Sequence, residues 1–166
     1  MIGRLFRWVI RGAVLAMGAS VVGAAFARQR IPSVGTGEDN DVALTAIFAP
    51  VEFESHAAAF RGGSLLLWYG GGDIDLRGVM LDPAGARLTV RAIFGGGRII
   101  VPETWAVDLR TRGIFGGSAD MRPAFERAPG APRLVIDGLT VFGGLAVFSS
   151  KPEIDALDDE DAASDD

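Results

Sequence analysis

The stretch Ile93-Phe94-Gly95-Gly96 recurs along the chain, and its repetition decides the fold. It returns unchanged at Ile114-Phe115-Gly116-Gly117 and, with valine first, at Val141-Phe142-Gly143-Gly144. Two degenerate copies, Ile47-Phe48-Ala49-Pro50 and Trp68-Tyr69-Gly70-Gly71, precede these. The aromatic residue therefore stands at positions 48, 69, 94, 115 and 142, at intervals of 21, 25, 21 and 27 residues. Periods of this length are typical of solenoid proteins, whose repeats bury their apolar faces only by stacking on one another.

Side chains alternate before each aromatic residue, and this alternation identifies the repeats as β-strands. Leu88, Val90, Ala92 and Phe94 fall on one side of an extended chain, and Thr89, Arg91 and Ile93 fall on the other. Because a one-residue slip would exchange the two faces, the shared parity places the aromatic residues in the interior. We therefore predict an all-β fold, a short single-domain right-handed β-solenoid with rungs of about 21–27 residues and a ladder of stacked aromatic rings.

Glycines follow the aromatic residue in most repeats and mark the corners of the predicted rungs. Glycine lets the chain bend tightly, and it lets the backbones of neighbouring rungs approach each other without a side chain between them. The predicted structural turns are Gly70, Gly71, Gly95, Gly96, Gly116, Gly117, Gly143 and Gly144.

The residue before each aromatic has the opposite parity and is predicted to face outward. On stacked rungs these apolar side chains would form a stripe roughly 20 Å long on the outside of the domain. Exposed apolar patches of this kind mark contacts with a protein or a membrane. The alternative is that the linker, a connecting loop or a bend at the glycines covers them. The residues of this apolar stripe are Ile47, Trp68, Ile93, Ile114 and Val141.

The N-terminal segment has the composition of a membrane helix. Residues 8–27 are apolar or small apart from Arg11, and twenty helical residues span a bilayer core of about 30 Å. We predict a single-pass anchor in the cell membrane through these residues. The alternative is a cleaved signal peptide with its small-residue site at Ala25-Phe26-Ala27, which would export the body after cleavage near Ala27. Counting Arg11, three arginines lie at the N-terminal end of the apolar run and two follow it, and this balance favours an extracytoplasmic body.

Charge and composition divide the chain into four parts. Residues 1–30 hold the predicted transmembrane anchor or signal segment, and residues 31–41 form a polar, turn-rich linker. Residues 42–150 form the β-domain, whose acidic and basic residues are interspersed, so we expect no nucleic-acid surface. Residues 151–166 carry one lysine against eight acidic side chains and are predicted to be a disordered acidic tail.

Side chains for catalysis are scarce in this sequence. His56 is the only histidine and there is no cysteine, which leaves no histidine or thiolate cage for a metal. Ser64 and Ser118 lack the sequence context of a nucleophilic serine. The stretch from Gly70 to Asp75 resembles one copy of a motif that binds calcium only in tandem. We therefore expect no enzymatic activity, no metal and no cofactor.

Three longer phrases resemble one protein family in the same order. They are FRGGSLLLWYGGGDIDLRG from Phe60 to Gly78, AIFGGGRIIVPETWAV from Ala92 to Val107, and PRLVIDGLTVFGGLAV from Pro132 to Val147. Over roughly residues 42–149 the chain thus resembles the C-terminal domain of the LiaF-like cell-wall-active antibiotics response proteins. The resemblance implies a short β-solenoid without enzymatic activity, in membrane proteins that sense or relay envelope stress. The best-known members inhibit a two-component histidine kinase.

The chain departs from the pattern of that family in two respects. It has one candidate membrane segment where those members have several. In addition, Asp120 stands at a position that is apolar in the other repeats, which predicts a local distortion of that rung. The equivalent residues in those repeats are Phe53, Ile74, Ile99 and Val147.

These observations predict a non-enzymatic, membrane-anchored sensory or interaction module of the envelope stress response. It would act through contacts with a membrane protein or a signalling protein. The alternative is a bactofilin-like scaffold, a homo-oligomer that assembles by stacking its β-solenoid rungs end to end. The polar residues Ser149, Ser150, Lys151 and Pro152 follow the last strand, where they would blunt a sheet edge and oppose such growth.

Overall fold

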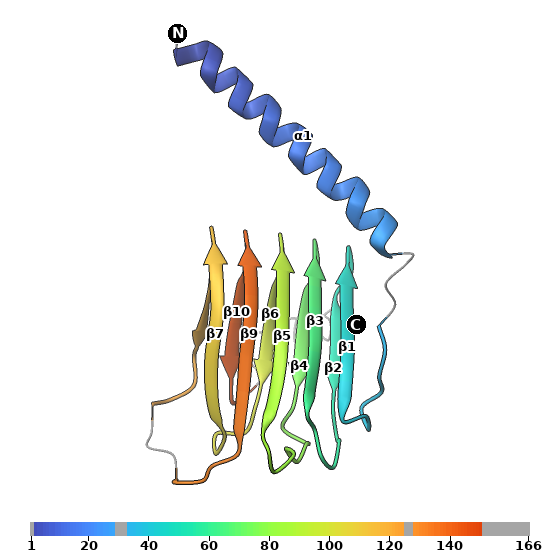
Figure 1. The fold of residues 1–166 in the computed structure, drawn as a ribbon, viewed down its shortest axis with the longest axis vertical. Coiled ribbons are helices and arrows are strands. Elements are labelled where there is room, and N and C mark those ends of the chain that lie inside the picture. The colour runs from blue at the N-terminus through green and yellow to red at the C-terminus, as the bar shows by residue number, and fades with distance from the viewer. Residues whose placement is uncertain (1, 29–32, 125–127, 151–166) are drawn as a thin grey trace, which may run out of the picture.

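The structure is a computed structural model that describes residues 2–28, 33–124 and 128–150. One long helix, α1 (Ile2–Arg28), leads into ten strands (Figure 1). The acidic tail, for which the sequence predicts disorder, lies outside the described residues. The strands are β1 (Asp41–Ile47), β2 (Val51–Glu54), β3 (Gly62–Trp68), β4 (Gly71–Asp75), β5 (Ala86–Ile93), β6 (Gly96–Ile100), β7 (Ala106–Ile114), β8 (Gly117–Asp120), β9 (Arg133–Val141) and β10 (Gly144–Phe148).

Two parallel sheets of five strands each form the domain. The odd-numbered strands make one sheet in the order β1-β3-β5-β9-β7, and the even-numbered strands make the other in the order β2-β4-β6-β10-β8. Each odd strand is followed by a tight corner and an even strand, and we call these three parts a rung. The predicted β-rich domain with one N-terminal helix is therefore confirmed.

The rungs do not follow one another in chain order. The fifth rung, β9 with β10, lies between the third rung, β5 with β6, and the fourth, β7 with β8. The edge strands at this side of the domain are therefore β7 and β8, and the last strand in the chain is an interior one. The prediction that the polar residues after Phe148 blunt a sheet edge is wrong for this reason.

The core lies between the two sheets and consists of rows of side chains in register. One row of the odd-numbered sheet contains Val42, Gly63, Leu88, Ile136 and Leu109. One row of the even-numbered sheet contains Phe53, Ile74, Ile99 and Val147. Leu88, Ile136, Ile74, Ile99 and Val147 are at most 1% exposed. Along the strands, the inward and outward parity is thus the one that the sequence predicts.

The aromatic residues stand at the corners, in the left-handed backbone region, with φ between 51° and 53°. Their rings stack with centroids 4.8–5.2 Å apart and planes within 11° of each other. Their predicted place in the interior is wrong, because Phe48, Phe142 and Phe115 are 38%, 48% and 79% exposed. A left-handed residue ends the extended chain, so strand parity no longer sets the direction of its side chain. In spatial order this aromatic ladder is Phe48, Tyr69, Phe94, Phe142 and Phe115.

The first glycine after the aromatic residue is required by close backbone approach. A Cβ added to Gly143 would overlap the carbonyl oxygen of Gly95, and one added to Gly95 would overlap that of Gly70. The second glycine has more room: the nearest atom to an added Cβ lies 3.0 Å away at Gly96, 3.6 Å at Gly144 and 3.8 Å at Gly71, and none lies within 4 Å at Gly117. The paired glycines therefore have unequal roles, and positive φ belongs to the aromatic residue before them.

Polar side chains close the core at the fourth rung. The Thr111 and Ser118 hydroxyls are hydrogen-bonded at 2.6 Å. Asp120 binds Arg122, whose side chain is 1% exposed and donates to the backbone carbonyl of Trp105 at 3.1 Å. Asp120 is in register with Val147 of β10, so the predicted distortion of this rung is not found in its strand pairing. Among the described residues no further rung covers these inward positions, so polar side chains can occupy them.

The opposite edge is covered by the linker. Val34 forms an antiparallel bridge with Ala43 of β1, with backbone N–H donors 2.7 and 2.8 Å from the carbonyl oxygens. The N–H group of Thr45 donates to the Ser33 hydroxyl at 2.9 Å. Part of the predicted linker thus occupies hydrogen-bonding groups of β1 that a further strand would need.

Candidate interaction surface

The corners of all the rungs lie together at one end of the domain, which we call the aromatic end. The odd-numbered strands point toward this end with their carboxyl termini, on the side of the domain where α1 lies (Figure 1). No residue of the aromatic end is charged, and its only polar side-chain groups are the indole N–H of Trp68 and the hydroxyl of Tyr69. The aromatic end consists of residues 47–50, 68–71, 93–96, 114–117 and 141–144.

The predicted apolar stripe forms a single row of residues in register within this end. Its spatial order is Ile47, Trp68, Ile93, Val141 and Ile114. Exposure rises along the row, from 3% for Ile47 to 49% for Ile114, and the three residues between them are partly buried. The row therefore offers accessible apolar surface mainly at the end near β7. Its role in binding stays a prediction.

Helix α1 covers the other end of the stripe. A Cβ added to Gly23 would lie 3.4 Å from Cη2 of Trp68, which is ordinary van der Waals contact. Ala24, the next residue, is fully buried. The alternative that a neighbouring segment covers the stripe thus holds in part, and the segment that contacts Trp68 is the helix.

Most of α1 lies away from the domain and exposes apolar side chains. Its span from Arg7 to Ala24 is long and apolar enough to cross a membrane. With a rise of 1.5 Å per residue, this span is about 27 Å long, close to the thickness of a bilayer core. Trp8, Leu15 and Val22 are 68%, 74% and 70% exposed, an arrangement that suits a lipid environment better than water.

Charged side chains are paired with one another away from the aromatic end. Arg61 donates from Nε to Asp41 at 2.9 Å, and Arg110 donates likewise to Asp108 at 2.9 Å. These hydrogen bonds favour the ionised carboxylates and hold the pKa of Asp41 and the pKa of Asp108 below the usual range of an aspartate. Arg87 pairs with Asp137 on the same sheet. Each of these arginines thus has an aspartate as its counter-charge within the domain.

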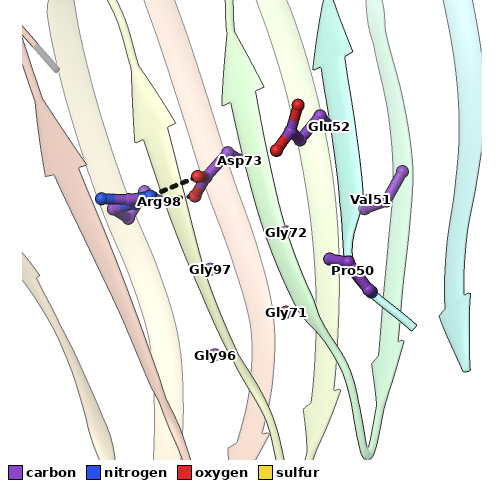
Figure 2. Close-up of a pocket in the computed structure, with 9 residues that line it drawn as sticks. All are labelled: Pro50, Val51, Glu52, Gly71, Gly72, Asp73, Gly96, Gly97 and Arg98. Carbon is purple, nitrogen blue, oxygen red and sulfur yellow. Dashed lines mark hydrogen bonds and ion pairs between the residues drawn. The ribbon is translucent and has the colours of Figure 1, made fainter. Parts of the chain in front are cut away.

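A shallow groove runs along the even-numbered sheet where its glycines lie side by side (Figure 2). Its volume is about 300 Å³. Gly71, Gly72, Gly96 and Gly97 line it with backbone, and Asp73 accepts a hydrogen bond from Nε of Arg98 at 2.7 Å. Asp73 is thus paired with arginine, and Glu52 adds a second carboxylate to the lining of the groove.

The side chains that could support catalysis do not converge. His56 lies 3.5 Å from the carboxylate of Glu54, and both side chains are more than half exposed. Asp73 and Asp75 of the single glycine-aspartate motif bind Arg98 and Arg77. Within the described parts of the chain, no three histidine or carboxylate side chains are grouped so as to hold a metal ion.

The aromatic rings are the part of this surface that sequence reasoning placed wrongly. Their position directly before a crowded glycine is the signal that could have located them, because a tight corner ends the alternation of the strand. The apolar stripe was expected on the surface, but the contact of α1 with Trp68 was not. Comparisons of the chain with protein-family models, with curated proteins and with solved structures gave no match.

Proposed function

We propose that the chain is a membrane-anchored interaction module without enzymatic activity, of the LiaF-like type that its sequence resembles. The observation that supports this most is the continuity of α1 with the uncharged aromatic end, through Gly23 and Trp68. An anchor that contacts this surface would hold it at a membrane. In this proposal the rungs form a short right-handed β-solenoid whose fourth rung, closed by polar side chains, is the cap.

The partner in this proposal is a membrane or signalling protein of the envelope stress response. It would contact the apolar stripe beyond α1, at Ile93, Val141 and Ile114. The outward position and partial exposure of these side chains support such a contact. Side chains of a neighbouring transmembrane or juxtamembrane segment could pack there much as α1 packs against Trp68.

Site-directed crosslinking of the full chain in cells tests this function. With a photoreactive phenylalanine derivative in place of Ile114, we expect a discrete crosslinked protein, and Ile93→Ser should weaken that crosslink several-fold. The matched control carries the same derivative at Met80, which is 65% exposed at the opposite end of the domain. Crosslinks of equal yield and pattern at both positions, or none at Ile114, would refute the proposed contact.

The body lies outside the cytoplasm in this proposal. The balance of three arginines at the N-terminal end of the apolar run, Arg11 included, against two after it supports this orientation. An export-dependent reporter fused after residue 150 should be active, and a reporter that works only in the cytoplasm should be silent. The opposite pair of results would reverse the orientation.

A scaffold is the second candidate function, and the edge strand β7 favours it. On its outer side β7 has no strand partner within the described residues, so its peptide groups could pair with a second copy. At the other edge, Val34 occupies part of β1. Assembly through β7 alone would give a symmetric pair and would stop there. Sedimentation of the full chain in detergent distinguishes the outcomes, since long filaments require two open edges.

A further inference from the structure

The geometry points to a second contact of this module, with lipid: we propose that the aromatic ladder rests in the headgroup layer of the membrane that α1 crosses. This inference relies on the proposed membrane anchoring by α1. The occupant is a lipid surface, and the contacting residues are the exposed rings of Phe48, Phe142 and Phe115 with their neighbours in the ladder.

The distance between domain and membrane carries the first step. The apolar span ends at Ala24, and Ala24 is fully buried where the helix meets the domain. Gly23 faces Trp68 closely, since a Cβ added to Gly23 would lie 3.4 Å from the indole ring. Because the apolar span ends where α1 lies against Trp68, the aromatic end lies beside the end of the span and thus next to the bilayer surface. Figure 1 shows α1 passing above the ends of the odd-numbered strands.

The chemistry of the aromatic end carries the second step. Aromatic side chains are enriched where a membrane meets water, because their rings are apolar and polarisable and sit at the level of the headgroups. The aromatic end has no charged residue to oppose such a contact. A water-facing surface would gain nothing from Phe115, which is 79% exposed.

The backbone at the corners supplies an independent observation. Each ring of the ladder is carried by a residue with φ between 51° and 53°, where a side chain with a Cβ is disfavoured. Glycine would adopt this conformation without strain, yet every corner has an aromatic residue. Each rung therefore has a strained backbone conformation at the residue that carries the ring. Such strain at every rung indicates that the rings have a function.

The residues that border the aromatic end on the odd-numbered sheet fit an anionic surface. Arg91 and Arg112 are exposed and share one outward row with Thr45, Leu66 and Leu139, and this row contains no carboxylate. Arginine near a membrane surface is attracted to anionic headgroups. The row lies two residues before the apolar stripe, so its guanidinium groups can reach headgroups beside the ladder.

A pair of labelled variants tests the inference. The chain has no cysteine, so Phe115→Cys and Met80→Cys each introduce one unique site for an environment-sensitive fluorophore. Each labelled full chain is reconstituted into vesicles of phosphatidylcholine and phosphatidylglycerol, with a nitroxide on a fraction of the headgroups. We expect the label at position 115 to be quenched at least about three-fold more strongly than the label at position 80, and to emit at shorter wavelength.

The controls separate failure of the lipid contact from failure of the anchor. Both variants should float with the vesicles, and circular dichroism should match that of the unmodified chain; if Phe115→Cys fails to fold, Phe142→Cys takes its place. Flotation with equal quenching at both ends overturns the lipid contact and leaves the ladder free for a protein. Chains that do not float refute the anchoring by α1, and with it the position of the domain at a membrane.

Discussion

Replacing Gly143 with alanine should lower the free energy of unfolding by about 3 kcal/mol, because the new Cβ cannot fit against the neighbouring rung. At this corner the Cβ would overlap the carbonyl oxygen of Gly95, which belongs to backbone and cannot rotate away. Gly143 lies in the fifth rung, which has a rung on each side, so neither neighbour can move aside freely. Urea denaturation of the full chain in detergent, followed by circular dichroism, measures the change.

Gly117→Ala is the matched control for this corner effect. Gly117 is the second residue after Phe115, just as Gly144 is the second residue after Phe142. A Cβ added to Gly117 would meet nothing within 4 Å. We expect its free energy of unfolding to stay within about 0.5 kcal/mol of the unmodified chain. Equal stability of the Gly143 and Gly117 variants would mean that the rungs do not approach as closely as the structure indicates.

Arg122→Met should lower the free energy of unfolding by about 2 kcal/mol, the second largest effect that we expect. The arginine side chain is 1% exposed and donates to the carbonyl of Trp105 at 3.1 Å while it binds Asp120. Methionine fills similar space but removes this donor from the carbonyl and the Arg122 guanidinium from the carboxylate. Because Asp120 is 32% exposed, water restores part of the loss.

Arg110→Met provides the comparison for the buried arginine. Arg110 also binds the aspartate two residues before it, Asp108, but its side chain is 58% exposed. An exposed pair contributes little, so this variant should melt close to the unmodified chain. If both methionine variants lost the same stability, the polar cap of the fourth rung would be no more than a surface ion pair.

The strands were predictable from the sequence because their alternation is local. Leu88, Val90 and Ala92 point into the core, as their parity requires. The corners were not predictable in the same way, since the parity of Phe94 holds only while the chain stays extended. Composition does not reveal a left-handed phenylalanine, and the sequence predicts the tight bend at the adjacent glycine instead.

The order of the rungs depends on contacts between distant residues, which a repeated motif cannot specify because every copy can pair with every other. One departure from the repeat does indicate which rung lies at the edge. Ser118 and Asp120 occupy inward positions that are apolar or glycine in the other rungs, and such residues are acceptable only where the core ends. The position of α1 on Trp68 has no signal of this kind, because one apolar helix fits many apolar surfaces.

The exchanged order of the last rungs sets the sequence of events during synthesis. The first three rungs can dock in turn as the ribosome releases them, since each finds its neighbour already present. The fourth rung is synthesised before the fifth rung, which is its neighbour in the structure. β7 and β8 therefore have no strand to pair with until β9 and β10 have been made. We therefore expect completion of the domain to be a single late event, in which β9 and β10 dock on the third rung and β7 and β8 then pair with them.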